Sequence, residues 1–167
     1  AASDVYKRQY LTNVFQPLLR RLPDARPLWG LLGRETEAGR EEYARELEAT
    51  VKTLQCHPCV GCWVPFNEGW GQFDAAGAVE TVRRLDDTRL VDEASGWYDQ
   101  GGGDVDSLHN YFYPLRVRPR SRVVALSEYG GIAWPMPGHE PPRKTYGYGT
   151  ARSRAELTER YLSLIHI

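Results

Sequence analysis

The sequence lacks the features that mark membrane-bound and nucleic-acid-binding proteins. No apolar run approaches the ~20 residues that a membrane-spanning helix needs. The formal net charge is −1, and no cluster of Lys or Arg forms a phosphate-binding stripe. The N-terminus also has no apolar segment followed by a small-residue cleavage site, which favours a cytoplasmic location. We therefore expect neither a membrane nor a nucleic acid among the partners.

Cysteine is also scarce. The three cysteines, Cys56, Cys59 and Cys62, are spaced C-x₂-C-x₂-C with His57 among them, which resembles part of a zinc or iron–sulfur site. A fourth ligand at useful spacing is missing, so we predict no metal and no cofactor. Because Cys62 lies in the apolar run 60–66, we expect buried thiols of the reduced, intracellular type.

Aromatic residues, by contrast, are frequent. The chain has five Trp and ten Tyr among 167 residues, and most of them lie in the loops between Trp63 and Tyr148. An aromatic ring can cover the C–H face of a pyranose, so loop aromatics beside carboxylates suit a sugar-binding site. For any single ring, filling a gap in the core is an equally good explanation.

Hydrophobic periodicity predicts an α/β domain. Tyr43, Leu47 and Val51 lie on one apolar stripe of a helix, and the capping-box pattern Ser153-Arg-Ala-Glu156 opens a later one. Helices alternate with strands that end in polar residues, which favours a parallel sheet. The expected helices are 35–54, 74–85 and a last one from 153, and the expected strands are 60–66, 88–91, 104–111 and 122–126.

Three successive strand ends carry side chains suited to acid–base chemistry. They are Asn67-Glu68, His109 with Tyr111, and Glu128. In parallel βα folds of the barrel type, functional side chains collect at the C-terminal ends of strands, so Glu68 and Glu128 can converge on one bond. Hydrolysis of a glycoside needs such a pair, because one carboxyl protonates the leaving oxygen while the other meets the developing oxocarbenium ion. A single Glu at a strand end is more often a solvated charge.

Longer segments around these residues resemble a known family. Trp63-Val-Pro-Phe-Asn-Glu-Gly-Trp-Gly-Gln-Phe-Asp74 resembles the acid/base segment of glycoside hydrolase family 2, the β-galactosidase, β-glucuronidase and β-mannosidase family. Arg89-Leu-Val-Asp-Glu-Ala-Ser-Gly-Trp97, His109-Asn-Tyr111 and Leu126-Ser-Glu-Tyr-Gly-Gly131 are similar to later segments of that family. The similarity is strong over about 56–150 and looser over 34–55. Its specificity lies in the combination of Asn-Glu and Ser-Glu-Tyr-Gly with His-x-Tyr between them.

The resemblance implies a retaining β-glycoside hydrolase of the β-galactosidase type, which works by double displacement on a carbohydrate substrate. Glu68 would be the general acid/base and Glu128 the nucleophile, with their carboxyl groups ~5–5.5 Å apart. The same resemblance assigns sugar-binding roles to Asn67 (at the 2-hydroxyl), His109, Tyr111, Trp97, Trp70 and Trp134. Either His109 or Tyr111 would orient Glu128.

The resemblance also implies a partial (β/α)₈ TIM barrel, about half a barrel of parallel strands with helices. It would run from the helix before strand 4 to the helix after strand 7, within residues 10–161. Residues 1–9 and 162–167 match nothing in the family and are interpreted as non-native or artefactual ends. Half a barrel would have exposed sheet edges, which favour association. A catalytically inactive fragment or carbohydrate-binding scaffold derived from such an enzyme remains the alternative.

Overall fold

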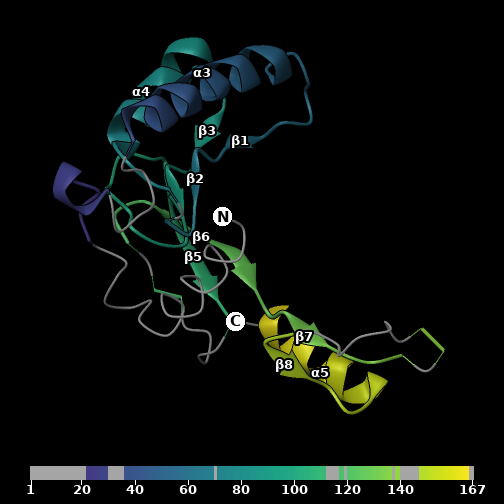
Figure 1. Cartoon of the computed structure of the whole chain (residues 1–167). Helices are drawn as coiled ribbons and strands as arrows, with labels where there is room; N and C mark the ends of the chain where they lie inside the picture. Colours follow the sequence, from purple (N-terminus) through teal and green to yellow (C-terminus); the bar gives the residue numbers. More distant parts are fainter. Residues whose placement is uncertain are drawn as a thin grey trace.

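The structure is a computed structural model that describes residues 22–29, 36–69, 71–111, 117–118, 120–136, 138–139 and 147–165. Figure 1 follows its elements along the chain. In order these are η1 (Arg26–Leu28), α3 (Glu37–Leu54), β1 (Cys62–Trp63), β2 (Phe66–Asn67), α4 (Ala75–Leu85), β3 (Leu90–Val91), β4 (Ala94–Ser95), β5 (Val105–Asn110), β6 (Val123–Tyr129), β7 (Ile132–Ala133), β8 (Gly149–Thr150) and α5 (Arg154–Ile165).

The predicted α/β class is confirmed. Among the described residues every paired strand is parallel to its partner: β1 with β3, β2 with β4, β5 with β6, and β7 with β8. These strands do not form a closed barrel. The expected end segment 1–9 lies outside the described residues, as do 166–167, and α5 continues past position 161 to Ile165.

The predicted helices are confirmed and have clear local causes. Helix α3 begins after Thr36, whose hydroxyl accepts a hydrogen bond from the Gly39 amide at 3.3 Å, as an N-cap residue does. Lys52 pairs with Glu48 one turn earlier on the exposed side. At α5 the Ser153 hydroxyl accepts from the Glu156 amide at 3.1 Å, in agreement with the predicted capping pattern.

The strand predicted at 60–66 is divided into β1 and β2 by Val64-Pro65. Proline has no N–H to donate to a neighbouring strand, so the ladder is interrupted there. The register is kept across the break, because Trp63 pairs with Val91 and Phe66 pairs with Ala94. Each short pair therefore continues the alignment of the other, and the two behave as one pair of parallel strands.

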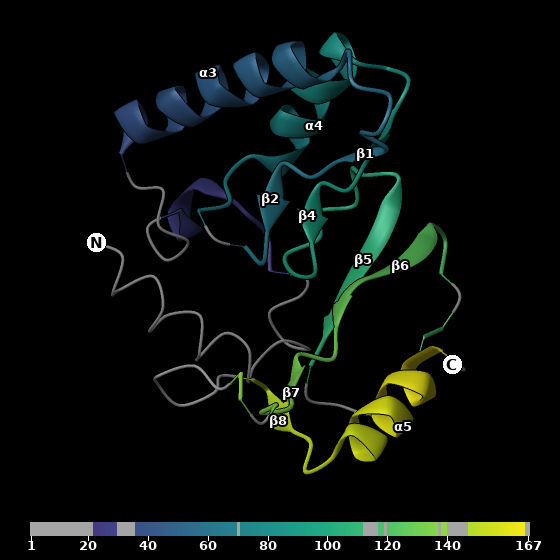
Figure 2. The same cartoon turned by 90° about the vertical axis from the view of Figure 1, so that its right-hand side faces the viewer.

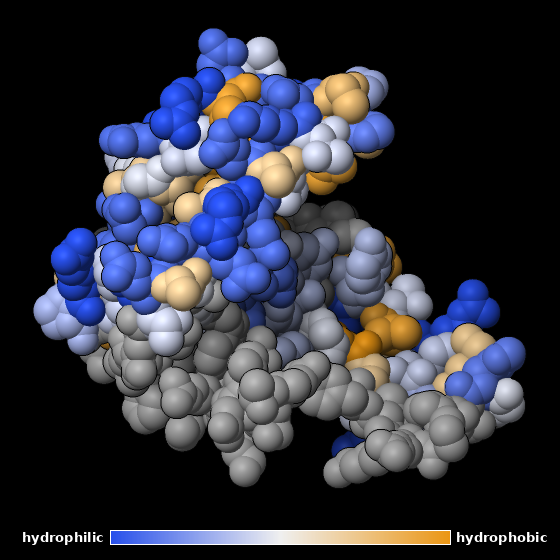
Figure 3. Space-filling view, turned by 45° about the horizontal axis from the view of Figure 1, so that its top comes forward, coloured by the Kyte–Doolittle hydropathy of each residue, from blue (hydrophilic) through white to orange (hydrophobic). Residues whose placement is uncertain are grey.

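Helices α3 and α4 cover one face of these strands, as Figure 2 shows. Val51 of α3 and Val82 of α4 pack with Trp63 and Val91 in one buried cluster. A second cluster surrounds Phe66, on which the Tyr43 ring stacks at 4.9 Å between ring centroids, with Ala75, Ala78 and Ala94. The outer surface of the two helices is mostly hydrophilic (Figure 3), so the core lies between the helices and the strands.

The expectation of buried cysteines was wrong. Cys56, Cys59 and Cys62 are all exposed free thiols. Cys62 alternates with Trp63 along β1, and only the Trp63 side faces the helices, because successive strand residues point to opposite faces. An apolar run of this kind predicts a buried strand, whereas the helices cover only the face that carries Trp63. None of the described helices is long and apolar enough to cross a membrane.

A polar cluster ties the end of α3 to the start of β3. Arg89 donates to the backbone carbonyls of Gln55 at 2.7 Å and Val60 at 2.8 Å, and to the carboxylate of Asp86 at 2.6 Å. Asp86 also accepts from the Thr88 hydroxyl at 2.6 Å and from the Trp63 indole at 2.8 Å. Hydrogen bonds from Thr88, Trp63 and Arg89 hold the pKa of Asp86 well below its usual range despite its burial.

The core predicts a difference in stability cost between a buried valine of β3 and an exposed valine of β6. Val91 is 0% exposed, whereas Val123 is 72% exposed. Replacing Val91 with Ala removes buried methyl groups and leaves a cavity, so we expect a loss of about 2 kcal/mol in the free energy of unfolding. The matched change Val123→Ala should cost about 0.5 kcal/mol or less. Urea unfolding of the two variants measures this, and equal losses would contradict the described core.

The Asp86 cluster predicts a pH-dependent contribution to stability. An unfolded Asp titrates near pH ~4, and the folded pKa of Asp86 lies lower. Its contribution to stability is therefore fully present above the unfolded pKa and is lost as the pH falls from there through the lower folded pKa. We expect Asp86→Asn to lower the melting temperature at pH 7, and the difference from wild type to shrink on acidification. Asp87→Asn, at an exposed neighbour, is the control, and a constant difference across pH would refute the assignment.

Candidate active site

The C-terminal ends of four strands meet at one edge of the structure. Asn67 at the end of β2 pairs in register with Ser95 at the end of β4. His109 near the end of β5 pairs with Glu128 near the end of β6. Strand β4 also contacts β5, and Glu68 follows β2 directly. The two glutamates predicted as a pair therefore lie on opposite sides of the β4–β5 junction.

Glu68 is buried and is held in an uncommon backbone conformation. Its φ is +55°, in the left-handed region that costs a residue with a side chain roughly 1–2 kcal/mol. The Glu68 amide donates to the Ser95 carbonyl at 2.9 Å, which fixes the backbone turn against β4. Its carboxylate oxygen Oε1 lies 2.9 Å from Nδ1 of His109. Strained residues of this kind concentrate at functional sites.

An irregularity in β6 places Glu128. The pairing of β5 with β6 shifts after Leu108, which opposes Leu126, so that His109 opposes Glu128 and Ser127 is the additional residue. In a regular strand, Ser127 and Glu128 would point to opposite faces. The bulge turns both towards the same side, where Ser127 contacts Ser95 and Glu128 faces the imidazole of His109.

Tyr111 and His109 both contact the Glu128 carboxylate. The Tyr111 hydroxyl donates to Oε2, and Nε2 of His109 lies 3.6 Å from Oε1. The Tyr111 ring stacks on Tyr148 with 4.2 Å between centroids. Burial, followed by the hydrogen bond to Glu128 and the negative charge of Glu128, raises the pKa of Tyr111 far above its ordinary value. The phenol therefore stays protonated and available as a donor to the carboxylate.

His109 is buried between the two carboxylates. The Trp97 ring packs against it edge to face, with 6.4 Å between centroids. Gly96 has a φ of +87°, and a Cβ at that position would lie 2.5 Å from the His109 ring. Glycine is therefore required for the imidazole to lie this close to the end of β4. Trp97 is fully buried. It therefore packs against the imidazole inside the protein and is not exposed to a ligand in this structure.

Glu68, His109 and Glu128 come very close together. One oxygen of each glutamate and one nitrogen of the histidine all lie within 4.8 Å of one another. Among the described residues this is the one group of three His, Cys, Asp or Glu side chains close enough to bind a metal ion, and the cysteines form no such group. The two nitrogens of His109 have Glu68 and Ser95 as hydrogen-bonding neighbours within the protein. These hydrogen bonds account for the position of the imidazole between the carboxylates without a bound cation.

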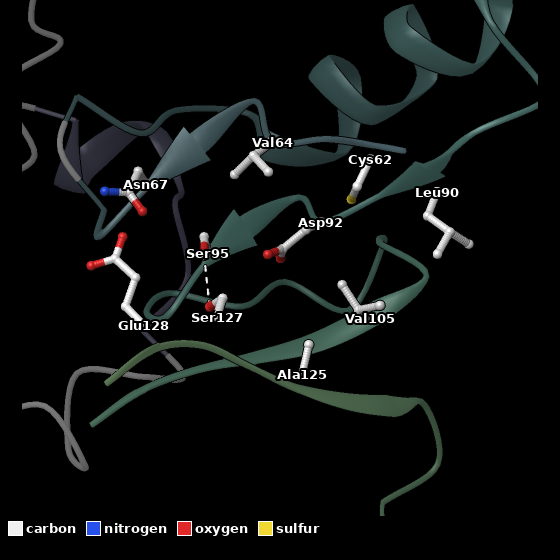
Figure 4. A pocket seen from close by; sticks show the side chains of 10 residues that line it. All are labelled: Cys62, Val64, Asn67, Leu90, Asp92, Ser95, Val105, Ala125, Ser127 and Glu128. Carbon is white, nitrogen blue, oxygen red and sulfur yellow. Dashed lines mark hydrogen bonds between the residues drawn. The ribbon is translucent and has the colours of Figure 1, made fainter. Parts of the chain in front are cut away.

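A groove of about 640 Å³ runs along the face of the strands that the helices leave uncovered. Figure 4 shows that its side chains change in character along its length. Cys62, Leu90 and Val105 line the groove towards the strand beginnings, Val64, Asp92 and Ala125 line its middle, and the polar side chains of Ser95, Ser127, Asn67 and Glu128 line it at the strand ends. Asn67 and Glu128 face each other at the polar end (Figure 4).

The structure brings most of the predicted site residues together. Glu68, Glu128, His109 and Tyr111 are linked by the contacts above, and Asn67 lines the groove with Glu128. Trp134 lies just after β7 and is partly exposed. The predicted Trp70 lies outside the described residues.

The site contains three residues that the sequence analysis did not identify. Ser95 and Ser127 lie 3.1 Å apart by their hydroxyl oxygens, and Asp92 is buried in the same groove. The polar end of β4 was the one available signal, since Ser95 ends its strand as Asn67 ends β2. The bulge brings Ser127 to the side of the site, which strand alternation does not predict. The sequence places Asp92 near the same edge, but only as a loop residue or one behind the site.

Comparisons with known proteins add no assignment: no protein-family model matches the chain, and no curated protein matches it.

The Tyr111–Glu128 contact predicts a spectroscopic change. Replacing Glu128 with Gln removes the negative charge and weakens the acceptor, two of the causes that raise the Tyr111 pKa. Tyr111 should then form its phenolate at a lower pH than in the wild type, and the near-ultraviolet absorbance of phenolate measures this. Tyr111→Phe identifies the affected transition by removing it. An identical titration in Glu128→Gln and wild type would show that the two groups do not interact.

Proposed function

We propose that the chain carries the catalytic pair of a retaining β-glycoside hydrolase, with Glu128 as nucleophile and Glu68 as general acid/base. The observation that carries this proposal is the approach of their carboxylate oxygens to within 4.8 Å, although they come from the ends of β2 and β6. Retaining enzymes hold the two carboxyl groups ~5–5.5 Å apart, whereas inverting enzymes leave ~6.5–9.5 Å for a water molecule. The short separation supports retention.

The different surroundings of the two glutamates support the division of roles. The Glu128 side chain is 41% exposed at the end of the groove and accepts a hydrogen bond from Tyr111, so a sugar can reach it and Tyr111 holds it in place for attack on the anomeric carbon. The Glu68 side chain is 8% exposed and lies behind Glu128 against His109, and a general acid must begin the reaction with its proton. A neutral Glu68 can give its proton to the leaving oxygen.

The reaction then follows in two displacements. Glu128 bonds to the anomeric carbon as Glu68 protonates the departing oxygen, which leaves a glycosyl-enzyme and an ionised Glu68. Glu68 next removes a proton from water, and the water oxygen displaces Glu128 from the sugar. Asn67 lies at the groove mouth opposite Glu128, within the region where the sugar hydroxyl next to the reacting carbon would bind.

We also propose that the strands belong to a (β/α)₈-type barrel. Their parallel pairing in chain order, the helices on one face and the polar groups at the C-terminal strand ends support this architecture. In such barrels the active site lies at the C-terminal ends of the strands. The sugar is not specified by these residues, so galactosides, glucuronides and mannosides all need to be compared.

Hydrolysis of chromogenic β-galactosides, β-glucuronides and β-mannosides by the chain tests the proposal. We expect turnover of at least one class, its loss in Glu128→Gln, and a decrease of about 10²–10⁴-fold in Glu68→Gln, the usual range for general acid–base catalysis. Glu80→Gln, at an exposed position of α4, should leave the rate unchanged.

Two further readouts separate catalysis from sugar binding alone. The first product anomer seen by NMR should have the β configuration, and a 2-deoxy-2-fluoro glycoside should label the peptide that contains Glu128. Binding without turnover or labelling would favour a carbohydrate-binding scaffold instead. Hydrolysis that survives Glu128→Gln would reject the assigned nucleophile.

A further inference from the structure

The inference concerns the tyrosine that packs behind the Tyr111–Glu128 contact, and its meaning for the reaction rests on the proposed function. Tyr148 directly precedes β8, and its ring stacks on the ring of Tyr111 with 4.2 Å between centroids and 24° between the ring planes. The Tyr111 hydroxyl in turn donates a hydrogen bond to Oε2 of Glu128. One side chain therefore separates Tyr148 from the proposed nucleophile.

The backbone that carries Tyr148 is also bonded to the turn that follows the nucleophile. The Tyr148 amide donates to the Gly131 carbonyl at 2.9 Å, and β7 and β8 continue this contact as a parallel pair. Figure 2 shows β6 running into β7 with β8 beside it. Tyr148 is therefore joined to Glu128 by two routes: its amide bonds to the chain that follows β6, and its ring packs on Tyr111 just after β5.

Two glycines allow these segments to lie so close together. Gly131 has a φ of +64°, and a Cβ at that position would lie 2.5 Å from the ring of Tyr148. A Cβ on Gly147 would lie 2.8 Å from the Cβ of Ala133. A residue with a side chain at either position would separate the two segments or displace the ring. The close packing therefore fixes where the Tyr148 ring lies relative to the turn.

Glu128 depends on such support because its side chain is 41% exposed at the end of the groove. An exposed carboxylate can turn to other rotamers and into water unless a hydrogen bond holds it. The Tyr111 hydroxyl reaches Oε2 of Glu128 from one position of its ring, and a stacked aromatic neighbour favours one ring position over others. Attack on the anomeric carbon is fast only when the reacting atoms are held in the right geometry.

We propose that Tyr148 is a positioning residue, whose stacked ring holds the Tyr111 hydroxyl on Glu128 and so keeps the carboxylate directed at the anomeric carbon. The stack requires the aromatic ring of Tyr148 and not its hydroxyl. Phenylalanine should therefore replace it, whereas leucine, which is apolar but cannot stack, should not. This difference separates a role of the ring from a role of the hydroxyl or of apolar bulk.

Proton NMR of the Tyr111 hydroxyl tests the contact without any substrate. A phenol proton held on a carboxylate should give a low-field resonance that exchanges slowly with water, identified by its loss in Tyr111→Phe and its shift in Glu128→Gln. We expect this resonance to persist in Tyr148→Phe and to broaden or disappear in Tyr148→Leu. Tyr161→Leu, at an exposed tyrosine of α5, is the control and should leave the resonance unchanged.

A double-mutant cycle tests the role of Tyr148 in the reaction. Tyr148→Leu should lower kcat about 2–10-fold, the range expected for one aromatic contact. KM should change by less than about twofold, because binding of the ground state is retained. Tyr148→Phe should keep the wild-type rate. In a Tyr111→Phe background, Tyr148→Leu should cost nothing further, because the hydroxyl that the ring positions has been removed.

The inference is overturned if the wild type lacks the low-field resonance, or if the resonance is the same in Tyr148→Leu and wild type. It is also overturned if the loss of rate in Tyr148→Leu persists undiminished in the Tyr111→Phe background, which would show that Tyr148 supports the fold instead. Should Tyr148→Leu not fold, Gly131→Ala decides, because its Cβ meets the Tyr148 ring. It should weaken the same resonance, and an unchanged resonance there refutes the proposal.

Failure of the proposed function has a different signature. If the chain hydrolyses none of the β-glycosides while the Tyr111 resonance depends on a ring at position 148, the contact assignment holds and the glycosidase proposal fails. If hydrolysis depends on Glu128 but Tyr148→Phe and Tyr148→Leu both react at the wild-type rate, the glycosidase proposal holds and the role of Tyr148 is refuted.

Discussion

One imidazole joins the two carboxylates, and much of the surrounding structure can be understood from the need to bury it in one orientation. A carboxyl group moved out of water loses solvation that hydrogen bonds must replace, and Glu68 shares such a bond with Nδ1 of His109 at 2.9 Å. The ring is planar and rigid, with its two nitrogens directed to different neighbours. The His109 ring can therefore contact Glu68 and Ser95 at the same time, although they lie at the ends of different strands. It also remains close to Glu128 of β6. Trp97 and Gly96 shape the space behind it.

Regular strands could not produce this arrangement. The left-handed backbone at Glu68 turns its side chain back over the strand ends, and the bulge at Ser127 brings two consecutive residues of β6 to one face. Such departures from regular geometry cost energy, so they persist where the surrounding packing enforces them. Here the enforcing contacts are the Glu68–Ser95 backbone hydrogen bond and the parallel pairing of β5 with β6. The distortions and the polar side chains fall at the same edge of the sheet.

The sequence predicted those parts of the structure that depend on local periodicity. The apolar stripe with Tyr43 and Val51 predicted helix α3, and the capping box at Ser153 predicted helix α5. The polar strand ends indicated that Glu68 and Glu128 would lie at one edge of the sheet. It did not predict the exposure of Cys62, because an apolar run does not reveal whether one or both faces are covered. Nor did it predict that Ser95 would contact His109 and Ser127, since these contacts arise from neighbours on other strands. A bulge such as that at Ser127 has no local signature in the letters around it.

The groove has a polarity that bears on where a sugar would bind. Its polar end holds Asn67 and Glu128, whereas Cys62 and Leu90 lie at the other end, where Leu90 is about half exposed. Parallel sheets are normally covered on both faces, whereas antiparallel sheets often present one polar face to water. The apolar side chains that line the groove, on the strand face opposite the helices, are therefore suited to burial. In a closed barrel the same positions would fill the interior with side chains, and only the strand ends would remain open to substrate. A glycoside would then meet the carboxylates from the open edge, with Glu128 reached first and Glu68 behind it, an order that agrees with their exposures of 41% and 8%.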